Sequence, residues 1–424
     1  MKIYIVSCVF LPEPVVSART SAHIAEKMSG LGHQVKVFAP LPSRPAGHDY
    51  SQFGYSLMRS KTSPHGYKII RCLSFFSAVS TLASRFLENI SFGLSVFFIL
   101  VFSPRADVVY GNTWPIFAQG LLMLVCKLRH MPLVLSVQDL YPESLLAQKR
   151  GIKKNSFLYS LLHWLDVQIT RNCAGLIVIS ERFKEAYVND RRISEDKITV
   201  IPNWIDDSQA VTTSPRDDIR KKHNVPTDAF LVIYGGNIGM AAGIENLIEA
   251  FQHLLAQENI YLLLAGAGSS LPDCLDLIRK RQLERVKIHS PWQVSDTYPL
   301  LSAADLCILP TQGEQSLVSV PSKLLSYMLA GRCILALATP GSETARILLD
   351  SQAGWVISTN DSISLANSIS KISRLSSAER DRPGEAGRNF VLKHFSISQN
   401  LPKVVEFLVR KGKCSEQNSS YAIQ

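Results

Sequence analysis

The chain has 424 residues, 46% of them hydrophobic and 19% charged, with a formal net charge of +10. This length exceeds what one hydrophobic core usually supports, so we expect two domains, and the ordinary composition excludes an extensively disordered protein. The eight cysteines are scattered without a Cys-x-x-Cys pair, which argues against disulfides and zinc ligands and predicts buried free thiols in a reducing compartment.

The positive charge is concentrated in the first half of the chain. Residues 1–200 hold 23 Lys and Arg against 13 Asp and Glu, whereas residues 201–424 hold 22 of each class. Such an excess is typical of a surface that meets nucleic acid or an anionic membrane. Because the sequence has no nucleic-acid-binding motif with interleaved aromatic residues, we do not expect nucleic acid as a partner.

Strand-like and helical patterns alternate through this first half. The opening run, residues 3–10, predicts a strand, and it is too short for a signal peptide. The next segment, residues 17–33, predicts a helix with Ser17 as its N-cap and Gly32 at its end. The later strand-like runs are VKVFAP, DVVYGN, LVLSVQ, GLIVIS and ITVIPN.

Two apolar segments of the first half have two alternative explanations. Residues 90–103 and 116–128 are both shorter than the roughly 20 apolar residues that a transmembrane helix needs. They are either core helices or helices that lie on the surface of a bilayer. The cations that flank them are Arg85, Arg105, Lys127 and Arg129.

A polar segment separates the first series of strands from a second one. Residues 204–229 are polar, contain Pro215 and Pro226, and predict a linker. The strand-like runs that follow are LVIYGG, YLLLAG, RVKIHS, LCILP, CILALA and GWVIS. Strands that alternate with helices predict parallel sheets covered on both faces.

The predicted fold class is therefore α/β, with two doubly wound parallel-sheet domains that face a central cleft. The domains are residues 1–203 and 230–394, joined by the linker. Residues 395–424 predict a last helix, which we expect to pack back on the first domain, and a disordered tail. In such sheets, ligands bind at the carboxyl ends of the strands.

The segment VPSKLLSYMLAG, residues 320–331, places a lysine where a helix does not favour one. Pro321 and Ser322 open the helix, so Lys323 lies in the first turn, beside N–H groups that carry positive partial charge. An anion held by Lys323 and by these amides would explain the placement. A solvated lysine on a surface helix is the alternative.

The order of these motifs resembles the retaining glycosyltransferases of family 4, which have the GT-B fold. The matching segments of the first half are residues 7–40, 175–190 and the Asn-x-x-Asp sequence at 203–206. The second half adds VIYGGNIGMAAGIENLIEAF, LLLAGAGS and PSKLLSYMLAGRCILA. The GN-x-G and PSK sequences resemble the branch that assembles bacterial surface polysaccharides of the O-antigen, capsule and colanic-acid type.

The resemblance implies an enzyme that moves a hexosyl or N-acetylhexosaminyl group from a nucleotide-diphosphate sugar, by family habit UDP-linked, with retention of configuration. It also implies a saccharide acceptor that is linked to a lipid. Together with the basic first half, this predicts a cytoplasmic protein that associates peripherally with the anionic inner face of the cell membrane.

Several positions differ from the common family pattern. Two glutamates eight positions apart are replaced by Val318 and Ser326, and Ser326 occupies the position of the usual ribose contact. A histidine often found in the first domain is replaced by Gln138. The other replacements, of an arginine, a lysine and two loop glycines, are Asn237, Ala242, Val15 and Val16.

The donor phosphates are expected near Lys323. A departing nucleoside diphosphate is stabilised by a metal or by preorganised cations and N–H groups. Because the sequence contains no Asp-x-Asp, the pair with which many glycosyltransferases hold a divalent cation, we expect no metal and no other cofactor. The donor-binding candidates in this segment are Pro321, Ser322, Lys323, Leu324 and Ser326, with the amides of 322–324 facing the phosphate and Lys323 also as a catalytic counterion.

The loop GGNIGMAAG, residues 235–243, is a second donor-binding candidate. Gly236 and Gly239 allow the backbone to approach a phosphate, and Asn237 can donate a hydrogen bond without charge. A plain strand–helix turn would look similar. Arg19 is expected to reach the same phosphates from the first domain, with a surface arginine as the alternative.

Three other segments are candidates by resemblance. HSPWQ resembles the segment that holds the nucleotide base, so Ser290 and Trp292 are donor-binding candidates. Glu314 follows a strand and is either a contact to the donor sugar or a solvent-exposed side chain. In the family, the leaving phosphate itself is usually described as accepting the proton of the acceptor, so no enzymic nucleophile is expected.

The acceptor is expected near LSVQDLYPES, residues 135–144. This segment ends a predicted strand with three polar side chains, Gln138, Asp139 and Glu143. Asp139 is the candidate catalytic group, as a base or as a positioning group for the acceptor hydroxyl. A helix-capping or structural aspartate is the alternative.

Two other functions share parts of this pattern. A GT-B nucleotide-sugar 2-epimerase would need acid and base side chains on both faces of the sugar, and the candidates here are few. A catalytically silent nucleotide-binding partner subunit is the other alternative, because the glutamate pair is altered. A dehydrogenase is disfavoured, since no strand is followed by G-x-G-x-x-G and a downstream acidic residue.

Overall fold

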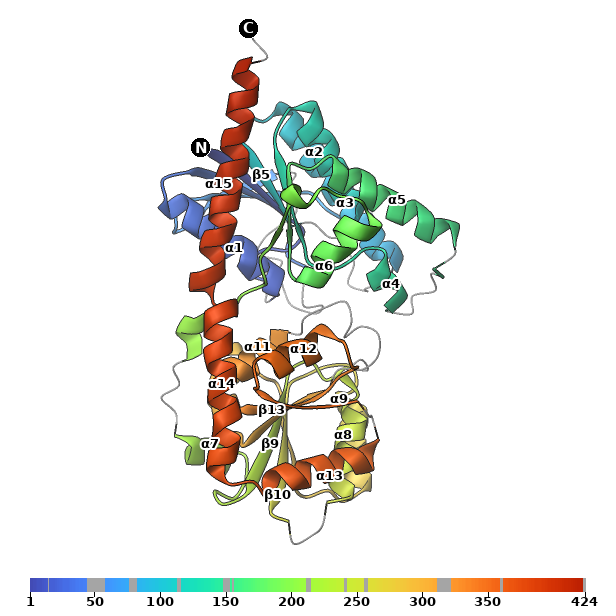
Figure 1. Ribbon diagram of the computed structural model, residues 1–424, viewed down its shortest axis with the longest axis vertical. Helices are drawn as coiled ribbons and strands as arrows, with labels where there is room; N and C mark the ends of the chain where they lie inside the picture. The colour runs from blue at the N-terminus through green and yellow to red at the C-terminus, as the bar shows by residue number, and fades with distance from the viewer. Residues whose placement is uncertain are drawn as a thin grey trace. The chain divides into compact units, whose positions relative to one another are not determined.

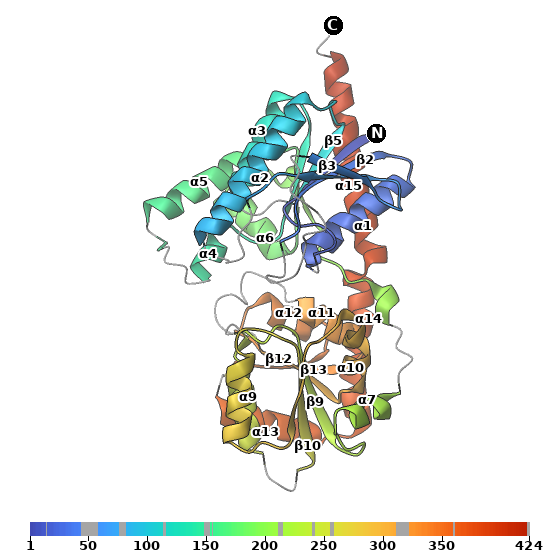
Figure 2. The ribbon, with the colours of Figure 1, turned by 180° about the vertical axis from the view of Figure 1, so that it is seen from behind.

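The computed structural model divides the chain into two compact units. The first comprises Met1–Trp204 and Ser398–Gln424, and the second comprises Ile205–Ile397 (Figures 1 and 2). The residues that the structure describes are 1–13, 15–43, 58–75, 82–112, 116–147, 153–154, 156–210, 215–239, 242–254, 258–310, 322–358 and 361–421.

The first unit is built on an eight-stranded sheet of order β3-β4-β2-β1-β5-β6-β7-β8. Neighbouring strands are parallel except at the edge, where β3 runs antiparallel to β4. The strands are β1 (Lys2–Ser7), β2 (Gln34–Pro40), β3 (Met58–Thr62), β4 (Lys68–Cys72), β5 (Val108–Asn112), β6 (Leu133–Val137), β7 (Gly175–Val178) and β8 (Ile198–Val200). The central strands are buried on both faces, which explains their continuous apolar runs.

Helices cover both faces of this sheet. Helices α2, α3 and α5 lie on one face, and α1 and α15 lie on the other (Figures 1 and 2). The helices are α1 (Val16–Gly30), α2 (Leu82–Phe102), α3 (Ile116–Leu128), α4 (Glu143–Ala147), α5 (Phe157–Arg171), α6 (Glu181–Glu185) and α15 (Ile397–Tyr421), with a π-helix at Ala186–Asp190 and a 3-10 turn at Glu195–Lys197.

Two details of the first unit concern the ends of its helices. The N-cap of α1 is Val15, so the prediction of Ser17 was wrong by two residues, because polar residues inside the first turn resemble a cap. Gly32 follows the helix with a φ of +81°, as a glycine after a C-cap should. At the other end of the chain, the Phe407 ring of α15 packs against Gly175 in β7.

The second unit has a six-stranded, fully parallel sheet of order β11-β10-β9-β12-β13-β14. Its strands are β9 (Phe230–Gly235), β10 (Ile260–Ala265), β11 (Val286–His289), β12 (Leu306–Pro310), β13 (Cys333–Leu337) and β14 (Gly354–Ile357). Its helices are α7 (Arg216–Lys222), α8 (Ile244–Gln252), α9 (Leu271–Lys280), α10 (Thr297–Ala303), α11 (Ser322–Leu329), α12 (Glu343–Asp350), α13 (Ser362–Ser373) and α14 (Ser377–Phe395), with 3-10 turns at Asp207–Ala210 and Val294–Asp296.

Two doubly wound α/β sheets confirm the predicted fold class. Each face of the second sheet has its own apolar core, one with α10, α11, α12 and α14, and the other with α8, α9 and α13. Seven of the eight cysteines are buried free thiols, as predicted, and Cys414 is exposed.

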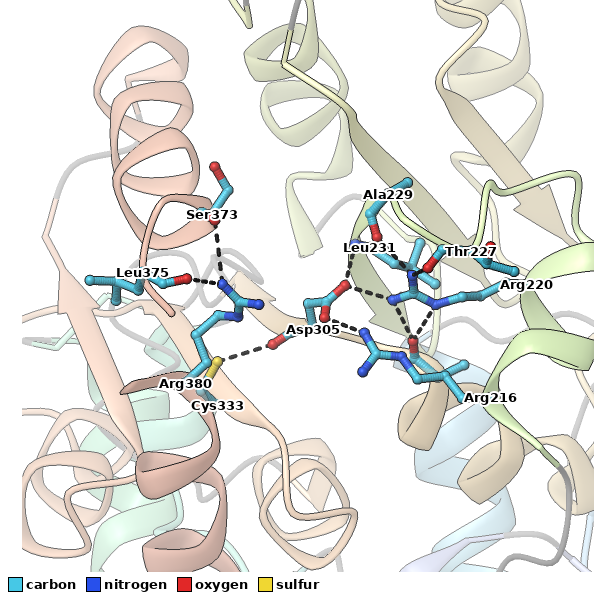
Figure 3. Close-up of polar contacts among 11 residues, drawn as sticks. Arg216, Arg220, Thr227, Ala229, Leu231, Asp305, Cys333, Ser373, Leu375 and Arg380 are labelled. Carbon is cyan, nitrogen blue, oxygen red and sulfur yellow. Dashed lines mark hydrogen bonds and ion pairs between the residues drawn. The ribbon is translucent and has the colours of Figure 1, made fainter. Parts of the chain in front are cut away.

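The segment expected to be a linker, residues 204–229, is part of the second unit from Ile205 onward and contains α7. The Arg220 side chain of α7 is buried and donates to Asp305 Oδ2 at 2.6 Å (Figure 3). It also donates to the carbonyl groups of Thr227, Ala229 and Ala303 at 2.7–3.2 Å. Arg220 thus attaches the segment to the amino end of β12, although the polar composition of the segment predicted a linker.

Asp305 is the centre of this cluster. Its Oδ2 also accepts from the Leu231 amide at 2.7 Å, and its Oδ1 is paired with the Arg216 guanidinium (Figure 3). Although burial opposes ionisation, the amide and the two arginines lower the pKa of Asp305 below its ordinary value. One carboxylate thus pairs with two guanidinium groups, and backbone carbonyl groups accept the remaining hydrogen bonds of Arg220.

Candidate functional site

Two side chains of α11 contact the carboxyl end of β9 in the second unit. Lys323 and Tyr327, four residues apart on α11, both contact it. The Tyr327 hydroxyl accepts from the Gly235 amide at 2.8 Å and donates to the Gly235 carbonyl at 3.1 Å. The first turn of α11 is therefore fixed beside the glycine turn that follows β9.

Lys323 is packed into this turn. Its Nζ donates to the Tyr234 hydroxyl at 2.5 Å and lies 4.5 Å from the centroid of the Tyr234 ring. A Cβ on Gly236 would overlap the Lys323 side chain, and the φ of +147° at Gly236 also favours glycine. Lys323 is therefore not the solvated surface lysine of the alternative explanation.

No carboxylate among the described residues pairs with Lys323, whose hydrogen-bond partner is the neutral Tyr234 hydroxyl. Burial lowers the pKa of Lys323 to about 8. A cation so placed gains from any anion that enters, because the anion would replace lost hydration. This arrangement is suited to a phosphate group, whose oxygens match an ammonium beside the N-terminus of a helix.

The amides of the glycine loop are mostly engaged already. The Gly236 N–H donates to the Ala265 carbonyl at 2.8 Å, and the Ile238 N–H donates to the Ala267 carbonyl at 2.9 Å. The Gly236 amide is therefore engaged by the protein, and Lys323 fills the space where a side chain would be, so donor binding by Gly236 stays a prediction. The Asn237 carbonyl accepts from the Tyr234 hydroxyl at 2.6 Å, which links this loop to Lys323 through one phenol.

The other donor-binding candidates have different surroundings. The Leu324 side chain is buried in the core, so only its amide can face a ligand, and Ser322 is exposed at the first position of α11. Ser326 Oγ donates back to the Ser322 carbonyl at 3.4 Å. Gly239 lies beside the Asn237 side chain. Pro321 and Glu314 lie outside the described residues.

The HSPWQ segment follows β11 and approaches the same end of the sheet. The Gly266 amide donates to the His289 carbonyl at 2.9 Å, which joins the loops after β10 and β11. The Trp292 ring packs over Gly235, where a Cβ would come within 2.8 Å of it. Its Nε1 is buried and has no hydrogen-bond partner among the described residues, whereas Ser290 is exposed. Trp292 thus packs on the turn that also contacts Lys323.

In the first unit, Asp139 follows β6 and borders a small cavity of about 20 Å³. Its neighbours in the cavity wall include the polar side chains of Asn112, Ser136 and Asp166. This volume suits about one water molecule. Burial raises the pKa of Asp139 above its ordinary value. A proton acceptor next to a water-sized polar cavity is compatible with a base or with a positioning group.

Gln138 and Glu143, the other acceptor-binding candidates, are occupied by protein groups. The Gln138 amide donates to Ser136 Oγ at 2.9 Å and accepts from Asn203 Nδ2 at 2.7 Å. Both oxygens of Glu143 accept from Arg191 Nη2, at 2.8 and 3.0 Å. Gln138 and Glu143 are therefore bonded to other side chains of the first unit, and these bonds fix the position of the segment that carries Asp139.

Arg191 is the buried centre of that segment. Its Nε donates to Asp166 Oδ2 at 2.6 Å, and its Nη2 also donates to the Tyr141 carbonyl at 3.0 Å. Burial raises the pKa of Asp166 to about 6, while Arg191 opposes the rise. The guanidinium thus joins α5 to the start of α4 and fixes the backbone just after Asp139.

Arg19 lies in the first turn of α1 and is partly buried. Helix α1 follows β1, the strand beside β5 in the middle of the first sheet. A contact between Arg19 and the donor phosphates therefore stays a prediction.

Comparison with known proteins identifies the family. Residues 17–209 match the family model Glycosyltransferase Family 4, and residues 229–374 match the model Glycosyl transferases group 1. The probable glycosyltransferase WbjE of Pseudomonas aeruginosa is 30% identical over 281 residues, which are 64% of this chain and 67% of that protein. The chain belongs to glycosyltransferase family 4.

Other relatives of this family 4 glycosyltransferase are also named as glycosyltransferases. The putative colanic acid biosynthesis glycosyl transferase WcaI of Escherichia coli K12 is 25% identical over 340 residues, or 78% of this chain and 82% of that protein. Among solved structures, Anabaena HepE has a TM-score of 0.71 at 15% identity, covering 97% of this chain and all of that one. WaaG, a glycosyltransferase of lipopolysaccharide biosynthesis, has a TM-score of 0.67 at 18% identity, with 96% and 99% covered. These likenesses confirm the GT-B fold.

Sequence reasoning missed several residues that shape the candidate site. Tyr234 and Tyr327 were not singled out, although Tyr327 is four residues after Lys323 and so shares its helix face. Gly266 was not predicted either, yet a Cβ there would overlap the Gly236 carbonyl. No local pattern distinguishes Arg191 from other arginines, because its three partners come from distant segments.

Proposed function

We propose that this family 4 glycosyltransferase transfers a sugar from a UDP-sugar to a lipid-linked saccharide during assembly of a bacterial surface polysaccharide, with retention of configuration. The observation that carries the donor assignment is Lys323, a half-buried ammonium at a helix N-terminus that pairs with no carboxylate of the described residues. A diphosphate supplies the missing negative charge.

The proposed chemistry follows from that placement. Cleavage of the bond between the sugar and the phosphate leaves negative charge on the nucleoside diphosphate. Lys323 and the first amides of α11 would stabilise this charge more strongly in the transition state than in the ground state. In the same-face substitution that we propose, a departing phosphate oxygen takes the proton of the acceptor hydroxyl, so the sugar keeps its configuration. Asp139 would position that hydroxyl for the transfer of its proton to the phosphate.

The proposal includes no metal and no other cofactor, because a preorganised cation can perform the task that a divalent metal performs elsewhere. Turnover that is unaffected by EDTA is the expected result. A complete loss of turnover in EDTA, restored by Mg²⁺ or Mn²⁺, would contradict this part of the proposal.

The relatives support the substrate classes. The solved HepE structures include complexes with UDP and with UDP-glucose. A Salmonella typhimurium relative, 26% identical over 244 residues, is a lipopolysaccharide 1,2-N-acetylglucosaminetransferase. A Staphylococcus aureus relative, CapM, acts in capsular polysaccharide biosynthesis. The names of the last two relatives refer to surface polysaccharides. From this we infer that the acceptor is linked to a lipid.

We further propose that the protein acts in the cytoplasm at the anionic inner face of the cell membrane. The basic excess of residues 1–200 supports this, because anionic lipids attract such surfaces. Within the described part of the chain, no helix combines the length and the hydropathy that crossing a membrane requires.

The first test is a thermal-shift screen of the full chain against UDP, GDP, CMP and their sugar conjugates, with and without EDTA. A ligand at 100 times its dissociation constant stabilises the folded state by about 2.7 kcal/mol. We expect a selective, EDTA-insensitive response to UDP. A response to GDP alone would reassign the base, and no response to any nucleotide would contradict the donor site.

A second measurement separates transfer from the alternatives. NMR of the product formed from UDP-sugar and a lipid-linked saccharide extract should show the anomeric configuration of the donor. An epimerised nucleotide-sugar without transfer would indicate the 2-epimerase, and nucleotide binding without any turnover would indicate a silent partner subunit.

A further inference from the structure

Three helices of the first unit expose an unusual share of its apolar side chains. Of the nineteen large hydrophobic side chains that are exposed among the described residues, eleven lie on α2, α3 and α5. Phe102 and Phe157 have 86% and 83% of their surface exposed. The eleven are Phe86, Leu87, Leu94, Phe98, Phe102, Leu124, Leu128, Phe157, Leu158, Leu161 and Trp164.

These side chains form stripes at helical spacing. On α2, Leu94, Phe98 and Phe102 follow each other at intervals of four and face away from the core. The opposite stripe of the same helix, which includes Phe92 and Val96, lies in the core of the first unit. Helix α2 is therefore apolar on both faces, which one interior alone does not explain.

The stripes of α3 and α5 continue the pattern. Leu124 and Leu128 are four residues apart on α3. Phe157, Leu161 and Trp164 follow at intervals of four and three on α5, so they also share one side of their helix.

The three helices pack in a row. A Cβ on Gly93 of α2 would meet Leu121 and Ala118 of α3, so these two helices approach closely. A Cβ on Gly120 of α3 would lie 3.5 Å from Ile169 of α5. Figure 2 shows α2, α3 and α5 together on one face of the sheet. We call the eleven exposed side chains on these helices the apolar helix face.

Cations border the apolar helix face at both ends. Arg129 donates to the Ser103 carbonyl at the end of α2, and Lys127 donates to Asn172 Oδ1 at the end of α5, so three helix ends meet there. The exposed cations around the face are Arg105, Lys127, Lys153, Lys154 and Arg171. The acidic residues of the three helices are Glu88 and Asp166, and Asp166 is buried against Arg191.

We propose that the apolar helix face inserts into one leaflet of an anionic bilayer, with its aromatic and leucine side chains at the boundary between headgroups and acyl chains. The bordering cations contact lipid phosphates. A second copy of the chain fits less well, because it would bring the same cations together. This inference rests on the proposed function, since a lipid-linked acceptor is held in that bilayer.

The test is co-sedimentation of the full chain with vesicles of phosphatidylcholine containing 30% phosphatidylglycerol. The variant Phe98→Gln/Phe102→Gln/Leu128→Gln should bind at least tenfold more weakly than the wild type. Its control, Leu275→Gln/Leu349→Gln/Ile363→Gln, removes exposed apolar side chains from the second unit and should bind as the wild type does. Equal binding by the two triple variants would overturn the proposal.

A second measurement reports insertion directly. Brominated acyl chains should quench the fluorescence of Trp164, and the quenching should fall sharply in Trp164→Phe. A wild type that is a dimer, does not bind vesicles, and becomes a monomer in the Phe98, Phe102 and Leu128 variant would overturn the proposal in favour of a second copy. The thermal response to UDP reports the donor site separately, so vesicle binding without a UDP response would contradict only the proposed function.

Discussion

Two cations of the second unit, the buried Arg220 and the half-buried Lys323, have opposite surroundings. Arg220 lies at the amino end of β12 with a carboxylate and three carbonyl groups around it, and its charge is balanced by Asp305 (Figure 3). Lys323 lies at the carboxyl end of β9, and its hydrogen-bond partner among the described residues is a neutral phenol. Among the described residues, the same sheet thus has a cation paired with a carboxylate at one end and a cation without a carboxylate partner at the other.

The difference separates structural charge from functional charge. A buried ion pair with all its hydrogen bonds made holds segments together, and breaking it leaves a charge without compensation. A buried cation without a counterion destabilises the empty protein and is stabilised when an anion binds. Arg220 therefore explains why residues 205–229 fold with the second unit, while Lys323 marks where a ligand is expected.

Replacing Arg220 should have the largest effect. Arg220→Met leaves Asp305 short of one cation and leaves three carbonyl groups without a donor, so the second unit should lose about 3–5 kcal/mol of unfolding free energy. Urea unfolding followed by circular dichroism measures this loss. A change below 1 kcal/mol would show that the cluster is not an anchor, and the exposed Arg279→Met serves as the control.

Replacing Lys323 should affect binding instead of folding. Lys323→Met should lose about 1.5–3 kcal/mol of UDP affinity, or roughly 10- to 150-fold, the usual contribution of a charge-assisted hydrogen bond. Its unfolding free energy without ligand should stay the same or rise, because a desolvated charge is removed. Isothermal titration and urea unfolding together test this contrast. A severe loss of stability with intact UDP affinity would reverse the roles of the two cations.

The pH dependence of UDP binding sharpens the contrast. The pKa of Lys323 is lowered from 10.5 to about 8, so the unfolded chain binds more protons than the native one between these values, and the ligand-free protein should gain stability as pH rises through them. UDP affinity should fall by up to about tenfold per pH unit above pH 8, as the ammonium loses its proton. In Lys323→Arg, affinity should stay level between pH 8 and 9.5. An equal slope in both proteins would contradict the assignment to Lys323.

The smallest effect is expected for the phenol. Tyr234→Phe removes the hydroxyl that accepts from Lys323 and donates to the Asn237 carbonyl. UDP affinity should fall by about 0.5–1.5 kcal/mol, or roughly 2- to 10-fold, because the ammonium is less well oriented. The matched variant Tyr261→Phe, on the neighbouring strand β10, should leave the affinity unchanged. A loss as large as that of Lys323→Met would mean that the phenol itself contacts the ligand.

Much of the fold was predictable from local pattern. The continuous apolar runs indicated buried parallel strands, and the structure has strands at each of the quoted runs in both halves. The antiparallel pair of β3 with β4 was not predicted, because the edge strand β3 is polar and includes Lys61, and because β4 is short and begins and ends with the polar residues Lys68 and Cys72 around two isoleucines and an arginine. The helix α7 was missed for a related reason, since its surface is polar and Arg220 is its buried residue.

The candidate site was predictable in its residue types but not in its contacts. Lys323 in a first helical turn was noticeable because it opposes the helix dipole. That its partner is Tyr234, and that the Gly236 amide is already engaged by Ala265, depends on strands that are distant in sequence. The same holds for Glu143, whose contact with Arg191 spans 48 positions.

The α/β class, the two series of strands, the family and the uneven distribution of charge can all be read from the amino-acid sequence, because periodicity, motif order and composition are local or additive properties. Which charged side chains are paired with opposite charges depends on the folded arrangement of the chain. Arg220 and Arg191 meet carboxylates, whereas Lys323 meets a phenol, and Phe102 and Trp164 stay exposed although other residues of their helices are buried. Pairing and burial depend on which distant segments the fold brings together, and that information is not carried by any one stretch of the chain.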